Sequence, residues 1–295
     1  MAGVAVVTDS TSSLSSAQAL LAEVAVIPLQ VVIDHESRAE SDDGATPAIV
    51  ADALRRGQQV TTSRPTVEAF GATFAALAAQ GYEAIVSAHL SRRMSGTYEA
   101  AVLAAGAAEL PVIVVDTETL ALASGFAVLS GAAAARSGAG ADAVAEVVRR
   151  RAAAATTYFS VATLDYLRRG GRIGAATALL GSALSVKPLL TVGHGEIRPL
   201  ERVRTTSKAL SRLQELALAA AARAQQDCAP VDVAVYHLDA LEAAAGLAER
   251  LRQRLGGEPM LIAEISAVLG VHVGPGTVGI VVSPRPGGPE PSPGS

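Results

Sequence analysis

The chain has 295 residues, a formal net charge of −4 and 50% hydrophobic residues, but only 3% aromatic ones. This length exceeds what one hydrophobic core usually serves, so we expect two domains. The mild acidity argues against a nucleic-acid partner, whose phosphates require a basic face, and the scarcity of aromatic side chains argues against base-stacking platforms. A single cysteine, Cys228, excludes an intrachain disulfide and a cysteine-rich metal site.

The sequence shows neither a membrane span nor a secretory signal. The best candidate run, at 126–135, is interrupted by Ser130 and Gly131, whereas a spanning helix requires ~18 uninterrupted apolar residues. The N-terminal residues lack a basic region and reach Asp9 too early for a signal peptide. We therefore expect a cytoplasmic protein whose contact with membranes is at most transient.

The first half alternates short β-branched runs with alanine-rich stretches of helical periodicity. Strands are predicted at 4–7, 85–88 and 112–115, with a further apolar run at 24–33. Helices are predicted at 15–21, 47–56, 66–79, 96–108, 119–135 and 141–153. Ser15 and Gln18 have the spacing of a capping box, and Thr66 is placed to cap the helix that follows Pro65. The alternation predicts a Rossmann-like domain with an open parallel sheet.

The second half has a different pattern. Runs at 186–192 and 197–203 flank His194-Gly195, which has the composition of a hairpin turn, so antiparallel pairing is expected. Helices are predicted at 164–169, 207–225 and 240–255, and further strands at 231–236, 260–265 and 278–282. We expect an α/β fold with two domains, at 1–150 and 151–283, the second with a mixed or antiparallel sheet. The Pro- and Gly-rich residues 284–295 are expected to be a disordered tail.

A glycine-rich stretch at 274–279 matches the pattern G-x-G-x-x-G. A dinucleotide site needs a helix after this pattern, whereas a strand-like run follows here, so the cofactor interpretation fails. What remains is a loop whose backbone can approach a ligand closely, beside His272. A structural histidine and a ligand-binding histidine are equally compatible with this spacing.

The segment Ser95-Gly96-Thr97 follows two arginines and opens a predicted helix. It comes after the strand at 85–88, so it lies at the carboxyl end of a parallel strand, where ligands bind in such sheets. Free N–H groups and the helix dipole favour an anion there. An ordinary serine cap explains one hydroxyl but not three successive small or hydroxylated residues, so we favour an anion site.

Two further hydroxyl clusters are less specific. Residues 61–65, which include Thr62 and Ser63, are best interpreted as a capped turn before a helix. Asp9 starts a cluster that could supply an aspartyl nucleophile or a Mg²⁺ ligand, but no second acidic residue follows at the spacing of a phosphatase. A capping role for Asp9 is the better interpretation.

Several arginines follow one another near the end of the helix predicted at 164–169. Arg168 and Arg169 would interact favourably with the helix dipole. Arg172, which comes after Gly170 and Gly171, is harder to interpret as solvated surface. Its guanidinium can bind a carboxylate or a phosphate through two parallel hydrogen bonds.

The familiar catalytic motifs are missing. The sequence contains no G-x-x-x-x-G-K-[ST] loop, no G-x-S-x-G elbow and no H-E-x-x-H, and its histidines show no metal-ligand spacing. These observations favour a ligand-binding protein without metal or cofactor over a self-sufficient catalyst.

Taken together, the motifs resemble the DegV family of bacterial lipid-binding proteins. The resemblance rests on VVTDSTSSLS at 6–15, TTSRPTVEAF at 61–70, HLSRRMSGTYEAA at 89–101, VIVVDTETLALASGFAV at 112–128, VATLDYLRRGGRIG at 161–174, SVKPLLTVGHGEIRPLERVRTTSKA at 185–209 and ISAVLGVHVGPGTVG at 265–279. Their order and spacing make chance agreement implausible. Arg64 stands where glutamine is usual, and Arg92 and Thr119 replace common serines, which affects the pocket entrance and leaves the assignment intact.

The resemblance implies a two-domain protein that holds one long-chain fatty acid between its domains. It also implies that the protein is the binding subunit of a fatty acid kinase, whose separate ATP-binding subunit phosphorylates the carboxylate to an acyl phosphate. The carboxylate-binding positions of the family correspond to Thr62 or Ser63, Ser95, Gly96, Arg172 and His272. A protonated His272 would donate a charge-assisted hydrogen bond to the carboxylate.

The ligand class agrees with simple energetics. Burial of a C16 tail contributes about 12 kcal/mol before binding costs, at about 0.8 kcal/mol per methylene. We expect the tail to lie along the run at 24–33 and the helix that begins after Ala162.

Four arginines are candidate contacts for the kinase subunit, and a solvated basic face explains each of them equally well: Arg168, Arg169, Arg202 and Arg204.

Two alternatives to the kinase-subunit function stay open. In one, the protein is a lipid carrier or regulator without a kinase partner. In the other, it is a self-contained phosphotransferase or hydrolase that uses Asp9 and the hydroxyl clusters.

Overall fold

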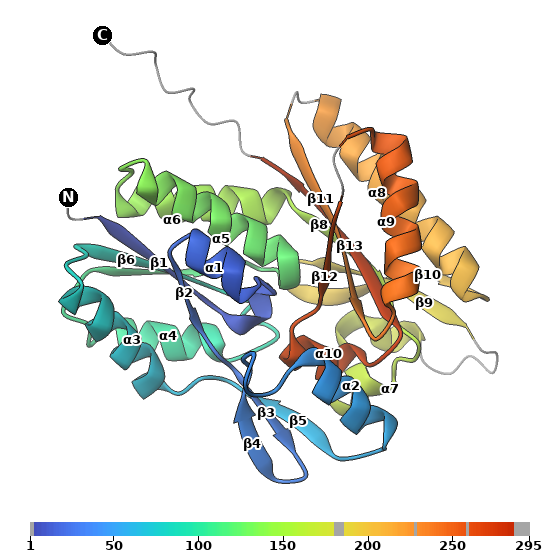
Figure 1. Ribbon diagram of the computed structural model, residues 1–295, viewed down its shortest axis with the longest axis horizontal. Helices are drawn as coiled ribbons and strands as arrows, with labels where there is room; N and C mark the ends of the chain where they lie inside the picture. Colours follow the sequence, from blue (N-terminus) through green and yellow to red (C-terminus); the bar gives the residue numbers. More distant parts are fainter. Residues whose placement is uncertain (1–2, 180–185, 227–228, 258–259, 286–295) are drawn as a thin grey trace.

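The structure is a computed structural model that describes residues 3–179, 186–226, 229–257 and 260–285. Its fold is α/β and contains three sheets: a parallel one, a mixed one and a small antiparallel one (Figure 1). The predicted alternation of parallel strands and helices in the first half, and the predicted mixed sheet in the second, are both confirmed.

The parallel sheet is built by the first half of the chain. Its strand order is β2-β1-β6-β7, with β1 (Val4–Asp9), β2 (Val24–Ile27), β6 (Ala84–His89) and β7 (Val112–Asp116). Helices α3 (Val67–Ala79) and α4 (Thr97–Ala105) pack on one face, and α5 (Ala121–Arg136) and α6 (Ala141–Ala154) pack on the other. Ala5 and Val7 face the first pair, while Val6 faces the second, as the alternation of side chains along a strand requires.

Local capping signals in this half are confirmed. Ser15 and Gln18 form the predicted capping box of α1 (Ser16–Leu21), and Thr66 accepts a hydrogen bond from the backbone N–H of Ala69 at the start of α3. The apolar run at 24–33 is split at Pro28, because β2 belongs to the parallel sheet and β3 (Gln30–Ile33) belongs to the small sheet.

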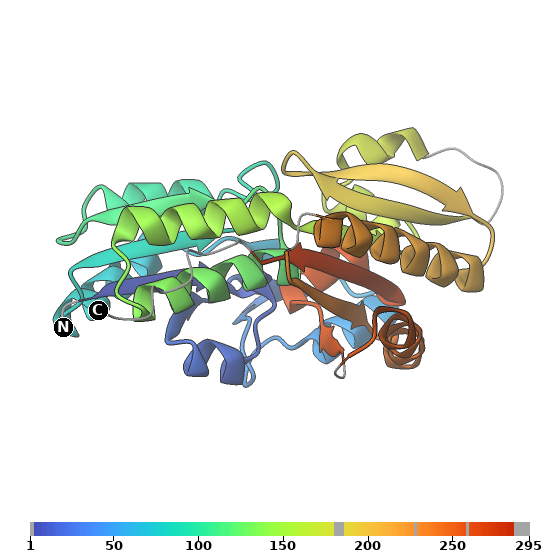
Figure 2. The same cartoon turned by 90° about the horizontal axis from the view of Figure 1, so that it is seen from above.

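The six-stranded mixed sheet is built by the second half. Its order is β10-β9-β8-β13-β11-β12, with β8 (Thr156–Ser160), β9 (Lys187–Gly193), β10 (Glu196–Val203), β11 (Val231–Leu238), β12 (Leu261–Glu264) and β13 (Thr277–Pro284). Only β11 and β12 pair in parallel among these neighbours. Helices α8 (Thr206–Gln226) and α9 (Leu241–Leu255) cover one face (Figure 2). The predicted hairpin at His194-Gly195 is confirmed, and both residues have a positive φ.

The small antiparallel sheet was not predicted. It has the order β4-β3-β5, with β4 (Glu36–Ala39) and β5 (Val60–Ser63), and α2 (Pro47–Arg55) connects β4 to β5. Residues 61–63 therefore form a strand and not the start of a capped turn, because they pair with β3, about thirty positions earlier in the chain. Local sequence carries no signal for that pairing.

The segment before the glycine-rich stretch forms a short helix that was not predicted. This helix, α10 (Ala267–Val273), carries His272 two residues before Gly274. This helix packs against α2 and the small sheet through an apolar cluster that contains Leu29, Val31, Val50 and Val268. Segments from both halves of the chain thus share one core beside α10.

The last strand of the parallel sheet ends at Asp116, and the first strand of the mixed sheet begins at Thr156. The division at 150 itself stays a prediction. Pro284 and Arg285, which were assigned to the tail, pair with Val231 and with the Pro230 carbonyl, while the rest of the predicted tail lies outside the described residues. No helix in the described part of the chain is long and apolar enough to cross a membrane.

Candidate functional site

A pocket lies where the loops of the parallel sheet, the small sheet and α10 meet the face of the mixed sheet opposite α8 and α9. It encloses about 840 Å³ of space between atoms, part of it open to solvent. Its apolar lining residues are Leu29, Leu90, Met94, Leu120, Phe159, Leu167, Ile197, Ile265, Val268, Leu269 and Val273, together with the ring of Tyr236. Leu29 and Leu167 come from the two segments that were predicted to form its walls.

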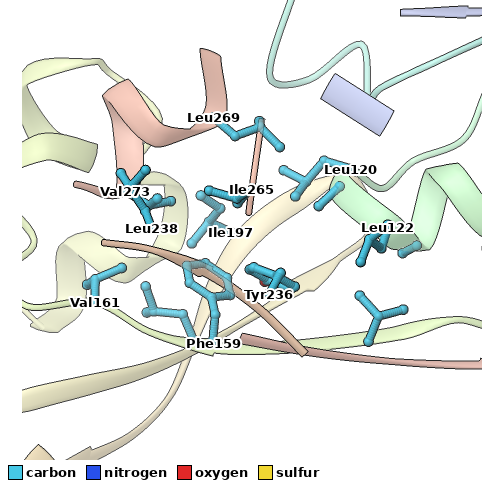
Figure 3. Close-up of a cluster of buried hydrophobic side chains, with 14 of the residues drawn as sticks. Leu120, Leu122, Phe159, Val161, Ile197, Tyr236, Leu238, Ile265, Leu269 and Val273 are labelled. Atoms are coloured by element: carbon cyan, nitrogen blue, oxygen red, sulfur yellow. The ribbon is translucent and has the colours of Figure 1, made fainter. Parts of the chain in front are cut away.

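The apolar wall is continuous with a buried core. Figure 3 shows Phe159, Ile197, Tyr236, Ile265 and Leu269 side by side, contributed by four strands or loops and by α10. All of these side chains are almost fully buried, although they border the pocket. The wall is therefore rigid and dry, as a binding site for an apolar molecule requires.

All six residues predicted to bind a carboxylate line this same pocket: Thr62, Ser63, Ser95, Gly96, Arg172 and His272. They come from four places in the chain, namely β5, the loop before α4, the loop after α7 (Asp165–Arg169), and α10. The structure brings them together, whereas their role as carboxylate ligands stays a prediction.

His272 and Thr62 are in direct contact within this polar group. The Thr62 hydroxyl oxygen lies 2.9 Å from Nε2 of His272, while Nδ1 of His272 is buried without a hydrogen-bond partner among the described residues. Burial, together with the nearby Arg172, lowers the pKa of His272 from 6.5 to about 4. Without a bound anion, His272 is therefore neutral at pH 7, and its protonation beside a carboxylate stays a prediction.

Glycines shape the surroundings of His272. A Cβ on Gly170 would lie 2.1 Å from Nδ1 of His272, and a Cβ on Gly274 would lie 2.1 Å from the ring of Tyr166. Gly274 also has a φ of 75°, in the left-handed region that glycine adopts without strain. The glycines after α7 and after α10 thus allow these two segments to touch at the pocket.

Ser95 and Gly96 occupy the N-terminus of α4, as predicted. The Ser95 hydroxyl lies 2.8 Å from the Thr97 hydroxyl and accepts the N–H of Thr97 at 3.3 Å. Gly96 is the N-cap residue and forms no side-chain cap, so N–H groups of the first turn beyond Thr97 have no capping partner from that residue. Arg64 donates a hydrogen bond to the Gly96 carbonyl at 3.3 Å and lines the pocket as well.

Arg172 is exposed at the pocket mouth. Its Nε donates to the Met94 carbonyl at 3.1 Å and its Nη1 donates to the Gly170 carbonyl at 2.6 Å. These two bonds tie the loop after α7 to the loop that carries Ser95. The guanidinium retains further N–H donors for an anion at the mouth.

Comparison with known proteins identifies the family of this chain. The model of the DegV family, COG1307, described as uncharacterised, matches residues 3–285. The chain belongs to the DegV family. A DegV domain-containing protein of Streptomyces coelicolor is 48% identical over 283 residues, which cover 96% of this chain and 99% of the relative.

Solved DegV structures agree with this fold closely. A DegV family protein from Thermus thermophilus, described for its fatty acid binding, superposes with a TM-score of 0.86 at 33% identity and covers 96% of this chain and 99% of its own. DegV of Bacillus subtilis, described as a fatty acid binding protein, has a TM-score of 0.86 at 31% identity, with 97% and 100% covered. DegV proteins of similar sequence thus bind fatty acids.

The other candidates in this DegV-family chain lie outside the pocket. Arg168, Arg169, Arg202 and Arg204 are all exposed, on α7, on β10 and just after it. No three His, Cys, Asp or Glu residues in the described ranges lie close enough together to hold a metal ion.

Asp9 takes part in a buried chain of hydrogen bonds with the order of a catalytic triad. Nδ1 of His89 lies 2.9 Å from Asp9, and Nε2 of His89 lies 2.7 Å from the hydroxyl of Ser87. However, all three side chains are buried, and Asp9 also accepts the N–H groups of Thr11 and Leu90. The predicted capping role of Asp9 is confirmed. Its hydrogen bonds to His89 and to the N–H of Leu90 also fix the start of the loop that leads to Ser95.

Sequence reasoning missed two residues of this region. Tyr236 borders the pocket from β11, and Glu40 contacts the start of α10. Neither belongs to a recognisable motif. Tyr236 follows Val233, Ala234 and Val235 in its strand, and only the tertiary contacts distinguish it from these apolar neighbours.

Proposed function

We propose that this protein binds one long-chain fatty acid in the pocket and presents its carboxylate to a separate, ATP-binding kinase subunit. The observation that carries the proposal is the division of the pocket lining into a continuous apolar wall and one group of polar residues. A molecule with a long apolar chain and a single anionic end matches that division. Solved DegV proteins that bind fatty acids support the same ligand class.

The polar group suits a carboxylate. The hydroxyls of Thr62 and Ser95, the guanidinium of Arg172 and the N–H groups at the start of α4 all donate hydrogen bonds that an anion can accept. A carboxylate beside His272 would raise the pKa of the imidazole above 4 and favour its protonation. Binding of the anion and of a proton would then reinforce each other.

The mouth of the pocket suits presentation to another protein. An adjoining cavity of about 840 Å³ shares Ser95, Gly96 and Arg172 with the pocket and is bordered by the exposed Arg92 and Arg93. A carboxylate held there is reachable from outside while its chain stays buried. In the proposed reaction, a carboxylate oxygen attacks the γ-phosphorus of ATP on the partner, an acyl phosphate forms, and ADP leaves.

The proposal extends to domains, partner contacts and location. We infer that residues 1–150 and 151–283 are two domains with the lipid between them. Arg168, Arg169, Arg202 and Arg204 are the proposed contacts for the kinase subunit, since all four are exposed. A cytoplasmic location follows from the need for ATP.

Lipid extraction followed by mass spectrometry tests the binding step. We expect the purified protein to carry one fatty acid per chain, or to take one up from a mixture. A protein that carries no acyl chain, and acquires none, contradicts the proposal.

A second experiment tests the kinase step and the position of the carboxylate. With a purified kinase subunit and ATP, we expect the double variant Ser95→Ala/His272→Ala to lose acyl phosphate formation more strongly than lipid retention. The exposed Ser211→Ala on α8 is the matched control and should change neither. Equal loss of both activities would mean that the carboxylate lies elsewhere. ATP hydrolysis by the isolated protein would favour the self-contained phosphotransferase instead.

A further inference from the structure

Tyr236 brings a polar atom into the apolar part of the pocket. It lies on β11, its side chain is 1% exposed, and it lines the pocket. On the neighbouring strands its register partner is Gly279, and the partner of Gly279 is Phe159. The three residues therefore form one row across the face of the mixed sheet that borders the pocket.

Gly279 decides how the tyrosine lies. A Cβ at this position would come within 2.2 Å of Cζ and 2.4 Å of the hydroxyl oxygen of Tyr236. The phenol end thus lies against Gly279, the residue between Tyr236 and Phe159 in the row. Any other residue at 279 would push the hydroxyl away from the sheet.

The hydroxyl of Tyr236 makes no hydrogen bond within the part of the chain that the structure describes, in contrast to the polar residues around His272. Figure 3 shows the side chain beside Phe159, with Ile197 and Ile265 on the same side and Leu122 on the other. Burial raises the pKa of Tyr236, so the group remains a protonated donor at neutral pH. A plain hydrocarbon chain beside it leaves this donor without a partner, whereas an oxygen acceptor on the chain would supply one.

Resting on the proposed fatty-acid site, we propose that the hydroxyl of Tyr236 selects acyl chains that carry an oxygen function partway along their length. A hydroxyl or keto oxygen at the matching depth accepts the hydrogen bond that a saturated chain leaves unmade. Sites that contain a polar group for a substrate oxygen discriminate against analogues that lack this oxygen. The expected preference is about tenfold in Kd, the usual effect of one buried hydrogen bond.

The test compares stearate, oleate and a positional series of monohydroxystearates as ligands of the full-length protein, with Kd measured by calorimetry. We expect at least one positional isomer to bind about tenfold more tightly than stearate. Tyr236→Phe removes only the hydroxyl, and it should abolish this preference, chiefly by weakening the binding of the preferred hydroxylated isomer. Tyr158→Phe is the matched control, because Tyr158 is buried on the opposite face of the same sheet, against α8 and α9, and it should keep the preference.

Several results would overturn the inference. Wild-type protein that binds stearate or oleate at least as tightly as every hydroxylated isomer contradicts it directly. A preference that persists in Tyr236→Phe assigns the selection to another residue. These outcomes leave the proposed function intact, whereas failure of all three ligand types to bind would overturn the proposed function and this inference together.

Discussion

His272 shows how one residue of this site is shaped by its surroundings. Its Nε2 contacts the Thr62 hydroxyl, its Nδ1 packs against the backbone of Gly170, and Arg172 lies close enough to disfavour a second positive charge. Burial is the main reason that the pKa of the imidazole falls to about 4. The side chain is thus held neutral and in one orientation, ready to gain a proton only when an anion arrives.

The lowered pKa of His272 predicts a pH dependence of stability. The folded-state pKa of about 4 lies below the value of 6.5 for an exposed imidazole, so the unfolded chain takes up the proton first. The free energy of unfolding should therefore decrease as the pH falls from 6.5 to 4, by at most about 3 kcal/mol from this residue.

Urea unfolding of wild-type protein and of His272→Gln across this pH range measures that contribution. We expect the difference in unfolding free energy between the two to shift steadily as the pH falls, in favour of the variant. His35→Gln is the control, because His35 is exposed, and it should follow the wild type. Parallel curves for His272→Gln and wild type would contradict the prediction.

At the scale of elements, α10 depends on its neighbours. The helix has seven residues, too few to be stable by itself, yet it carries His272 and three apolar lining residues. Ser266 caps its N-terminus, and the carboxylate of Glu40 accepts hydrogen bonds from the Ser266 hydroxyl at 3.0 Å and from the N–H of Ala267. Burial raises the pKa of Glu40, which these hydrogen bonds counteract in part. Glu40, the residue directly after β4, thereby anchors α10 at the pocket.

We expect Glu40→Ala to destabilise the protein by about 1–2 kcal/mol, because it removes the acceptor for the first N–H of α10. Lipid affinity should decrease with it, since the helix that carries His272 loses an anchor. Glu40→Gln keeps one acceptor oxygen and should lose less. Thermal unfolding and lipid binding check both effects, with the exposed Glu36→Ala as the control. An unchanged lipid affinity in Glu40→Ala would show that α10 is held by its apolar contacts alone.

At the scale of the whole molecule, polar contacts join the two halves on both sides of the pocket. Near the mouth, the Ser91 hydroxyl donates to the Gly195 carbonyl at 2.7 Å, and Arg93 pairs with Glu196 at 3.2 Å. Away from the mouth, the nearly buried Arg151 on α6 pairs with Asp232 on β11. Burial alone would raise the pKa of Asp232, but Arg285 and Arg151 outweigh it and lower the pKa.

Removal of the buried guanidinium should therefore weaken the connection between the halves. We expect Arg151→Met to lower the free energy of unfolding by about 2–4 kcal/mol, since it leaves Asp232 with Arg285 as its remaining ion-pair partner. Arg149→Met, on the exposed side of the same helix, should change it by less than about 0.5 kcal/mol. Urea unfolding measures both, and equal effects of the two variants would contradict the assigned role of Arg151.

Many elements of this fold could be predicted because their signals are local. The capping box of Ser15, the cap of Thr66 and the turn at His194-Gly195 each depend on residues within a few positions of one another. The small sheet could not be predicted in this way, because β5 pairs with β3 across α2. The helix α10 was missed for a related reason, as its short apolar segment is stabilised by Glu40 and by packing, and not by its own periodicity.

The sequence by itself determined the α/β class, the order of most strands and helices, and the family motifs that named six candidate residues. Only the tertiary structure decided that these six line one pocket, that His272 is neutral, and that Tyr236 places a hydroxyl on an apolar wall. The physical reason is the distance along the sequence over which each kind of interaction acts. Periodicity and caps act over a few residues, whereas Thr62 and His272 lie 210 positions apart, and their contact depends on the packing of every element between them.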